Sequence, residues 1–127
     1  MALAQRLREV LTSVLPVTEE DDGALTVRHD GTLASLRVVS IAEGLELISL
    51  SQILAWDVPM DRQIRIKIAE QARDSMLGTV ILIEKKRMGE VLLRYNFPGA
   101  GLTDEALCTL ILMVLSKGAD VRRALTE

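Results

Sequence analysis

From Leu25 to Leu50 the chain reads LTVRHDGTLASLRVVSIAEGLELISL, and this stretch indicates the fold class. Its apolar residues fall into three short β-prone runs, which are separated by His29-Asp30-Gly31 and by Gly44. Aspartate and glycine adopt turn conformations at little energetic cost, so both breaks are typical of tight turns. The stretch therefore predicts three antiparallel strands that follow one another as a meander.

A second hairpin is predicted further along the chain. The β-prone runs Thr79–Ile83 and Glu90–Phe97 are joined across the charged segment 85–89. The segment Thr18–Gly23, before the meander, is polar and ends in glycine, which is typical of a loop.

Two helices are predicted at the ends of the chain. Residues 2–15 place apolar side chains three and four positions apart, and Pro16 disfavours a helical conformation in the residue before it. The last helix starts at Thr103, whose hydroxyl can cap it, and extends to about Ala124.

The segment between Asp61 and Gly78 has two interpretations. Ile64, Ile66 and Ile68 alternate with charged residues, as they would in a half-buried strand. Over its full length, however, the segment has high helix propensity, and Asp61 could cap a helix that reaches Leu77. We therefore expect a helix here.

These elements give the order α-βββ-α-ββ-α over a single domain of residues 1–127. Strands that follow one another in hairpins, together with separate helices, predict an α+β fold. The expected sheet is antiparallel and five-stranded, with the helices packed against it.

Composition excludes several classes of partner. The net charge is −3 and the pI is about 5.2, so the chain has no positive field to attract nucleic acid or an anionic membrane. The apolar run 106–115 is about half the ~20 residues that a membrane span needs. A lone cysteine and the absence of a signal-peptide run at the start favour a cytoplasmic location.

No catalytic, metal-binding or cofactor-binding residue can be assigned. The single histidine, His29, falls in a predicted turn, and the single cysteine, Cys108, falls in the most apolar helix. A nucleophile and its base, or a zinc site, would need more such residues at suitable spacing. Gly99-Ala100-Gly101 lacks the rest of a phosphate-binding motif, and Asp104 follows where an anion would sit. The sequence therefore predicts a protein that is not an enzyme and holds no cofactor.

Apolar residues outside the core-facing helix stripes mark a candidate binding surface. On the last helix, Leu112 and Met113 fall largely outside the stripe that starts at Leu107. In the middle helix, Ile66 and Leu77 lie opposite the face that carries Ile64 and Ile68. A second chain or a ligand would cover such residues, and deep burial within the monomer is the alternative.

Several short motifs resemble the YbjN family. They are Asp30-Gly31-Thr32, the strand that ends in Asp57-Val58-Pro59, Tyr95-Asn96-Phe97-Pro98, and the capped helix that begins near Thr103. These are small bacterial proteins described as sensory transduction regulators, with a fold similar to that of type III secretion chaperones. The chain departs from the family in the aliphatic segment 65–69, where relatives tend to have a polar, Asn-rich helix.

The resemblance implies a non-catalytic protein-binding module of the chaperone, adaptor or regulatory type. It implies a homodimer, or a domain that holds an extended segment of another protein, and it supplies no catalytic residue. The alternative is a small-molecule sensor or an enzyme with a pocket between sheet and helices.

Overall fold

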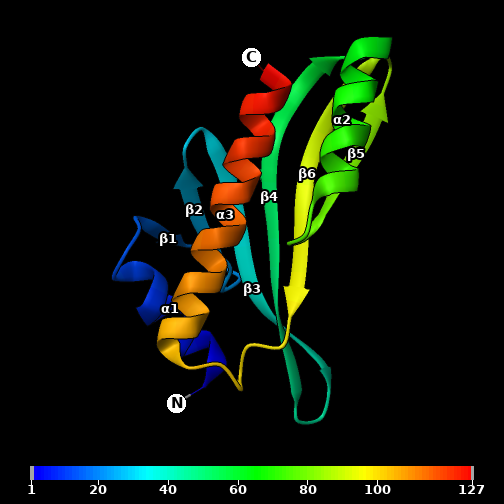
Figure 1. The fold of residues 1–127 in the computed structure, drawn as a ribbon. Coiled ribbons are helices and arrows are strands. Elements are labelled where there is room, and N and C mark those ends of the chain that lie inside the picture. Colours follow the sequence, from blue (N-terminus) through cyan, green and yellow to red (C-terminus); the bar gives the residue numbers. More distant parts are fainter. Residues whose placement is uncertain (1, 127) are drawn as a thin grey trace.

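All strands of the computed structural model join one antiparallel sheet, and the helices cover one face of it (Figure 1). The structure describes residues 2–126. The helices are α1 (Leu3–Thr12), α2 (Arg62–Asp74) and α3 (Asp104–Thr126). The strands are β1 (Val17–Glu19), β2 (Leu25–His29), β3 (Thr32–Ala42), β4 (Leu45–Pro59), β5 (Thr79–Lys85) and β6 (Met88–Phe97).

The strand order across the sheet is β1-β2-β3-β4-β6-β5. β4 is the longest strand and lies between β3 and β6, where Leu50 is opposite Leu36 on one side and Tyr95 on the other. α2 connects β4 to β5, which then returns beside β6 as a hairpin. The α+β class and the element order predicted from the sequence are therefore confirmed.

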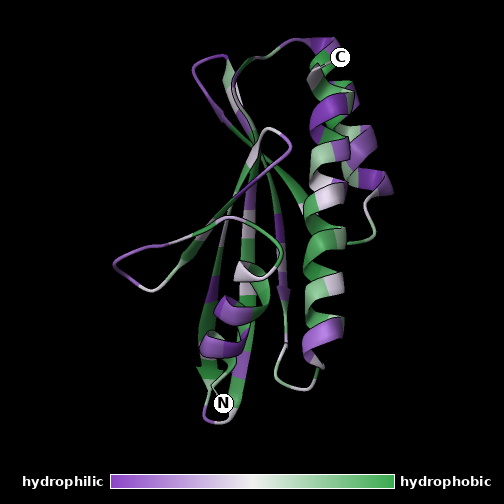
Figure 2. Cartoon of the chain, turned by 90° about the vertical axis from the view of Figure 1, so that its left-hand side faces the viewer, coloured by the Kyte–Doolittle hydropathy of each residue, from purple (hydrophilic) through white to green (hydrophobic). Residues whose placement is uncertain are grey.

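The hydrophobic core lies between the sheet and the helices. Every second residue of β3 and β4 points into it, including Leu36, Ile48, Leu50 and Leu54, all of which are fully buried. Figure 2 shows that hydrophobic residues dominate the middle of α3, while hydrophilic residues gather on α1 and at hairpin tips. Since α3 packs on β2, β3 and β4, it is the central helix of the layer.

Within residues 2–126 the sheet has six strands, so the predicted count of five is wrong. The extra strand is β1, whose first two residues, Val17 and Thr18, lie opposite Val27 and Thr26 of β2. The segment 18–23 was expected to be a loop because its side chains are polar. An edge strand gains its stability from backbone pairing, however, and its exposed side chains show no hydrophobic alternation that the sequence could reveal.

The middle segment is helical, as its overall propensity predicts, and Asp61 caps it. The Asp61 carboxylate accepts a hydrogen bond from the Ile64 backbone N–H at 2.8 Å. α2 ends at Asp74 rather than Leu77, because Ser75 is extended and its hydroxyl donates to the Gly78 carbonyl oxygen at 3.1 Å.

The limits of the other two helices also differ from expectation. α1 ends at Thr12 and a turn carries the chain to Pro16, so the expected end at Leu15 is wrong. α3 runs on to Thr126, beyond the expected end near Ala124. Among residues 2–126, no helix is both long and apolar enough to cross a bilayer.

Candidate functional site

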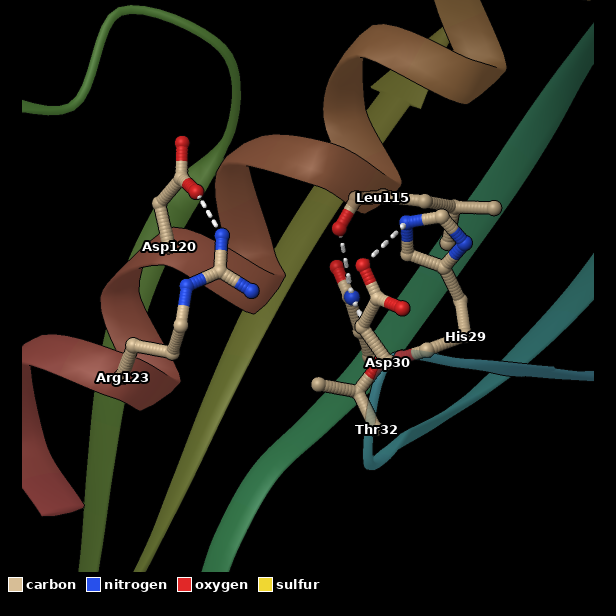
Figure 3. A network of polar contacts seen from close by, with 7 residues as sticks. His29, Asp30, Thr32, Leu115, Asp120 and Arg123 are labelled. Atoms are coloured by element: carbon tan, nitrogen blue, oxygen red, sulfur yellow. Dashed lines mark hydrogen bonds and ion pairs between the residues drawn. The ribbon is translucent and has the colours of Figure 1, made fainter.

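The single histidine lies at the end of β2, where the chain turns into β3 (Figure 3). Its Nε2 atom is 3.7 Å from a carboxylate oxygen of Asp30 and has no hydrogen-bond partner among residues 2–126. The Thr32 hydroxyl donates to the His29 carbonyl oxygen at 2.6 Å and accepts from Gln52 Nε2 at 2.8 Å. That hydroxyl is therefore engaged in holding the turn, and it makes no hydrogen bond to the imidazole.

Cys108 and metal-ligating side chains are the other candidate reactive groups. Cys108 lies in α3, half-buried against the hydrophobic core. Within residues 2–126, no three histidine, cysteine, aspartate or glutamate side chains come together as metal ligands.

Apolar side chains instead line a groove at the junction of α2 and α3. The groove has a volume of about 560 Å³. Met113 is 53% exposed and Met76 is 92% exposed, while Leu77 and Leu112 are half-buried. The remaining lining residues are polar: Asp74, Thr109, Ser116, Lys117 and Asp120.

Three residues predicted to bind a partner, Leu77, Leu112 and Met113, meet in this groove. Ile66 does not line it, although its side chain is 46% exposed on α2. The helical periodicity placed Leu77 on α2, and this is wrong, because the helix ends before it. Leu77 reaches the groove from the connection to β5 instead.

Met76 is the apolar groove residue that the sequence pattern did not identify. It follows the last turn of α2, in the segment between Ser75 and Gly78. Gly78 has a φ of +88°, a conformation that favours glycine, and it turns the chain into β5. A large apolar residue just before such a turn is the only signal in the sequence that could have identified it.

Two exposed ion pairs stand at the rim of the groove. Asp74 pairs with Arg73 at 3.2 Å, and Asp120 pairs with Arg123 one helical turn further along α3. Exposed pairs of this kind contribute little to stability, about 0–1 kcal/mol. Their charges therefore remain available to a partner that approaches the groove.

An ion pair between Arg65 and Glu84 joins the start of α2 to the end of β5, at the end of α2 away from the groove. Arg65 Nη1 donates to a Glu84 carboxylate oxygen at 2.7 Å, and a second bond completes a bidentate pair. The hydrogen bonds from Arg65 hold the pKa of Glu84 below its ordinary value, and the same contacts raise the pKa of Arg65. The carboxylate is thus kept charged in the position that fixes α2.

The fold is similar to a solved structure of YbjN from E. coli, a protein described as a candidate transcription regulator. The TM-score is 0.72 at 15% sequence identity, and the match covers 94% of this chain and 88% of that one. No protein-family model and no curated protein matches the sequence. The chain therefore has a YbjN-like fold, which confirms the fold resemblance carried by its turn and strand-end motifs.

Proposed function

We propose that this chain is a non-catalytic protein-binding module that forms a homodimer through the groove between α2 and α3. The observation that carries the proposal is the cluster of exposed or half-exposed apolar side chains there, with Met76 and Met113 the most exposed. Exposed apolar surface of this kind marks contact sites in soluble proteins. A cytoplasmic location belongs to the same proposal, since a single cysteine suits a reducing compartment.

Charge along α3 supports a second copy of the chain as the occupant. Glu105 lies in the first turn of α3 and Arg123 in the last, with Met113 near the midpoint between them. If two α3 helices pack antiparallel around Met113, the acidic start of each lies beside the basic end of the other. The surface is therefore complementary to itself in charge as well as in polarity.

The energies are sufficient for a measurable dimer. Burial of a methionine or leucine side chain contributes about 1.5–3 kcal/mol, and two-fold symmetry doubles each contribution. A micromolar dissociation constant corresponds to about 8 kcal/mol. The groove residues of two copies can supply that amount after the cost of ordering them.

Light scattering on the wild type and on Met113→Glu tests the proposal. The wild type should dimerise at tens of micromolar, and Met113→Glu should be a folded monomer by circular dichroism, because a buried glutamate in the interface is costly. Ile41→Glu is the matched control, since Ile41 is 57% exposed and lies outside the groove. A monomeric wild type, or a dimer that tolerates Met113→Glu, would overturn the proposal.

A small amphipathic molecule is the second candidate occupant. The groove volume of about 560 Å³ falls in the range of small-molecule sites. The groove lies within the helix layer, whereas a sensor pocket was expected between sheet and helices. Native mass spectrometry of the purified protein distinguishes the two candidates, since a sensor retains a ligand on the monomer and a dimerisation module does not.

A further inference from the structure

The sheet face opposite the helices carries an apolar row that crosses four strands. Leu33 of β3 lies opposite Ile53 of β4, Ile53 opposite Leu92 of β6, and Leu92 opposite Ile81 of β5. Each of these residues alternates with a neighbour that points toward the helices, such as Gln52 beside Ile53 and Leu93 beside Leu92. The row therefore lies on the open face.

This row is separate from the hydrophobic core. Leu92 is only 7% exposed, yet neither it nor Leu33, Ile53 or Ile81 belongs to the core cluster or packs against it. All three helices contribute residues to the core cluster, which lies on the opposite face of the sheet. Within residues 2–126 the helices therefore pack on that face and not on the row. Four aliphatic side chains thus shield one another on a face that the chain itself leaves uncovered.

Two arginines border the row. Arg28 of β2 lies opposite Leu33 and so extends the row at one end, while Arg94 lies in the next row, opposite Ser51. Neither side chain makes a hydrogen bond or an ion pair in the described part of the chain. The row on the other side contains one carboxylate, Glu90, opposite Ile83.

A hollow opens at the Arg28 end of the row. It has a volume of about 580 Å³, and its walls include Arg28, Leu33 and Trp56, together with the polar turn residues His29 and Asp30. Trp56 is 56% exposed. Aromatic residues and arginines are the side chains that most often anchor protein interfaces, so the hollow is suited to receive one anchoring side chain of a partner.

We infer that this open face binds an amphipathic helix of another protein that carries carboxylates beside its apolar stripe. A sheet face offers side chains but no free backbone groups, so its occupant must satisfy its own backbone hydrogen bonds, as a helix does. From Arg28 to Ile81 the row and the arginine that extends it cross five strands and so span four strand spacings, or ~19 Å, which a helix of about 13 residues matches. Carboxylates on that helix would pair with Arg28 and Arg94.

This inference is independent of the groove between α2 and α3. The groove lies in the helix layer and the row lies on the other face of the sheet, although Met76 of the groove also lines a hollow with Ile81 and Arg94. Met113 does not line that hollow, so a variant at Met113 can disable the groove and spare the row.

The probe is a synthetic helical peptide of about 14 residues without tryptophan, with leucines at i, i+3, i+4 and i+7 and glutamates on both flanks. Its matched control has lysine in place of every glutamate. Trp56 is the single tryptophan of the chain, so its fluorescence reports binding at the hollow directly. The acidic peptide should bind saturably, shift the emission to shorter wavelength and lose affinity as salt is raised.

Arg28→Glu and Arg94→Glu should each lower the affinity for the acidic peptide about tenfold or more, which corresponds to ~1.4 kcal/mol of binding free energy. Both variants should keep the wild-type circular dichroism spectrum, because both side chains are exposed and unpaired in the described chain. Met113→Glu should bind the peptide normally even if it no longer dimerises. The inference would be overturned if the acidic peptide did not bind saturably or if the lysine peptide bound equally well. It would also be overturned if neither arginine variant changed the affinity for the acidic peptide.

Discussion

The side chain of Gln52 lies directly against Gly118, so α3 crosses the centre of the sheet at a residue that has no β-carbon. Gln52 is fully buried, and its Nε2 donates to the Thr32 hydroxyl at 2.8 Å and to the Leu115 carbonyl oxygen at 3.0 Å. A buried amide with two bonds to different elements fixes how α3 sits on β4. That position in turn leaves Met113 on the outer side of the helix.

Gly118→Ala should destabilise the protein. The added β-carbon would overlap Gln52 and disturb both of its hydrogen bonds, at a cost of about 1–3 kcal/mol for overpacking and a similar amount for the amide. The gain in helix propensity is only about 1 kcal/mol, so we expect the free energy of unfolding measured in urea to fall by ~3 kcal/mol.

Gly101→Ala is the control for this substitution, since nothing lies within 4 Å of a β-carbon at that position. It should change the unfolding midpoint little. If Gly118→Ala were as stable as Gly101→Ala, the close approach of Gln52 to α3 would be contradicted.

The fold could be predicted largely because its decisive signals are local. Turn residues such as Asp30-Gly31 and alternation along 33–38 specify a hairpin without knowledge of distant residues. β1 could not be predicted in this way, because its pairing depends on β2 and its own side chains are exposed.

Acid should weaken the contact between α2 and β5. The pKa of Glu84 lies below its ordinary value of 4.5 because Arg65 donates hydrogen bonds to it and attracts it electrostatically. The stability from this pair is therefore fully present above pH 4.5 and is lost as the pH falls through the folded-state pKa.

The substitution Glu84→Gln should reduce the difference between urea midpoints measured near neutral pH and near pH ~3. Glu46→Gln serves as the control, since Glu46 makes no side-chain hydrogen bond or ion pair in the described residues. If the difference between the two urea midpoints were the same in Glu84→Gln as in the wild type, the Arg65–Glu84 pair would not contribute to folding stability.

Exchange of charges tests the antiparallel arrangement of α3 in the dimer. Glu105→Lys or Arg123→Glu should each weaken dimerisation about tenfold, because each places like charges together at two symmetric positions. The double variant should recover most of the wild-type affinity in sedimentation analysis. If the double variant lost as much dimer affinity as each single variant, this arrangement would be excluded. Circular dichroism would show whether α3 itself remains folded in the variants.

The candidate site could be predicted only in part because helical periodicity holds only inside a helix. Leu112 and Met113 lie within α3, and the pattern placed them correctly outside the buried stripe. Leu77 follows α2, so its direction is set by the turn at Gly78. The open-face row was not recognised at all, since it exists only once four strands are in register.

Adjacent residues of β6 offer a test of the two sheet faces. Leu93 is fully buried in the core, whereas Leu92 lies on the open face. Leu93→Ala should leave a cavity that is closed to solvent and lower the free energy of unfolding by about 3–5 kcal/mol. At Leu92 solvent can enter the space left by the side chain, so Leu92→Ala should cost mainly the transfer free energy, about 1–2 kcal/mol. Urea unfolding of the two variants measures the difference, and an equal loss would mean that the open face is packed as tightly as the core and is not a surface for a partner.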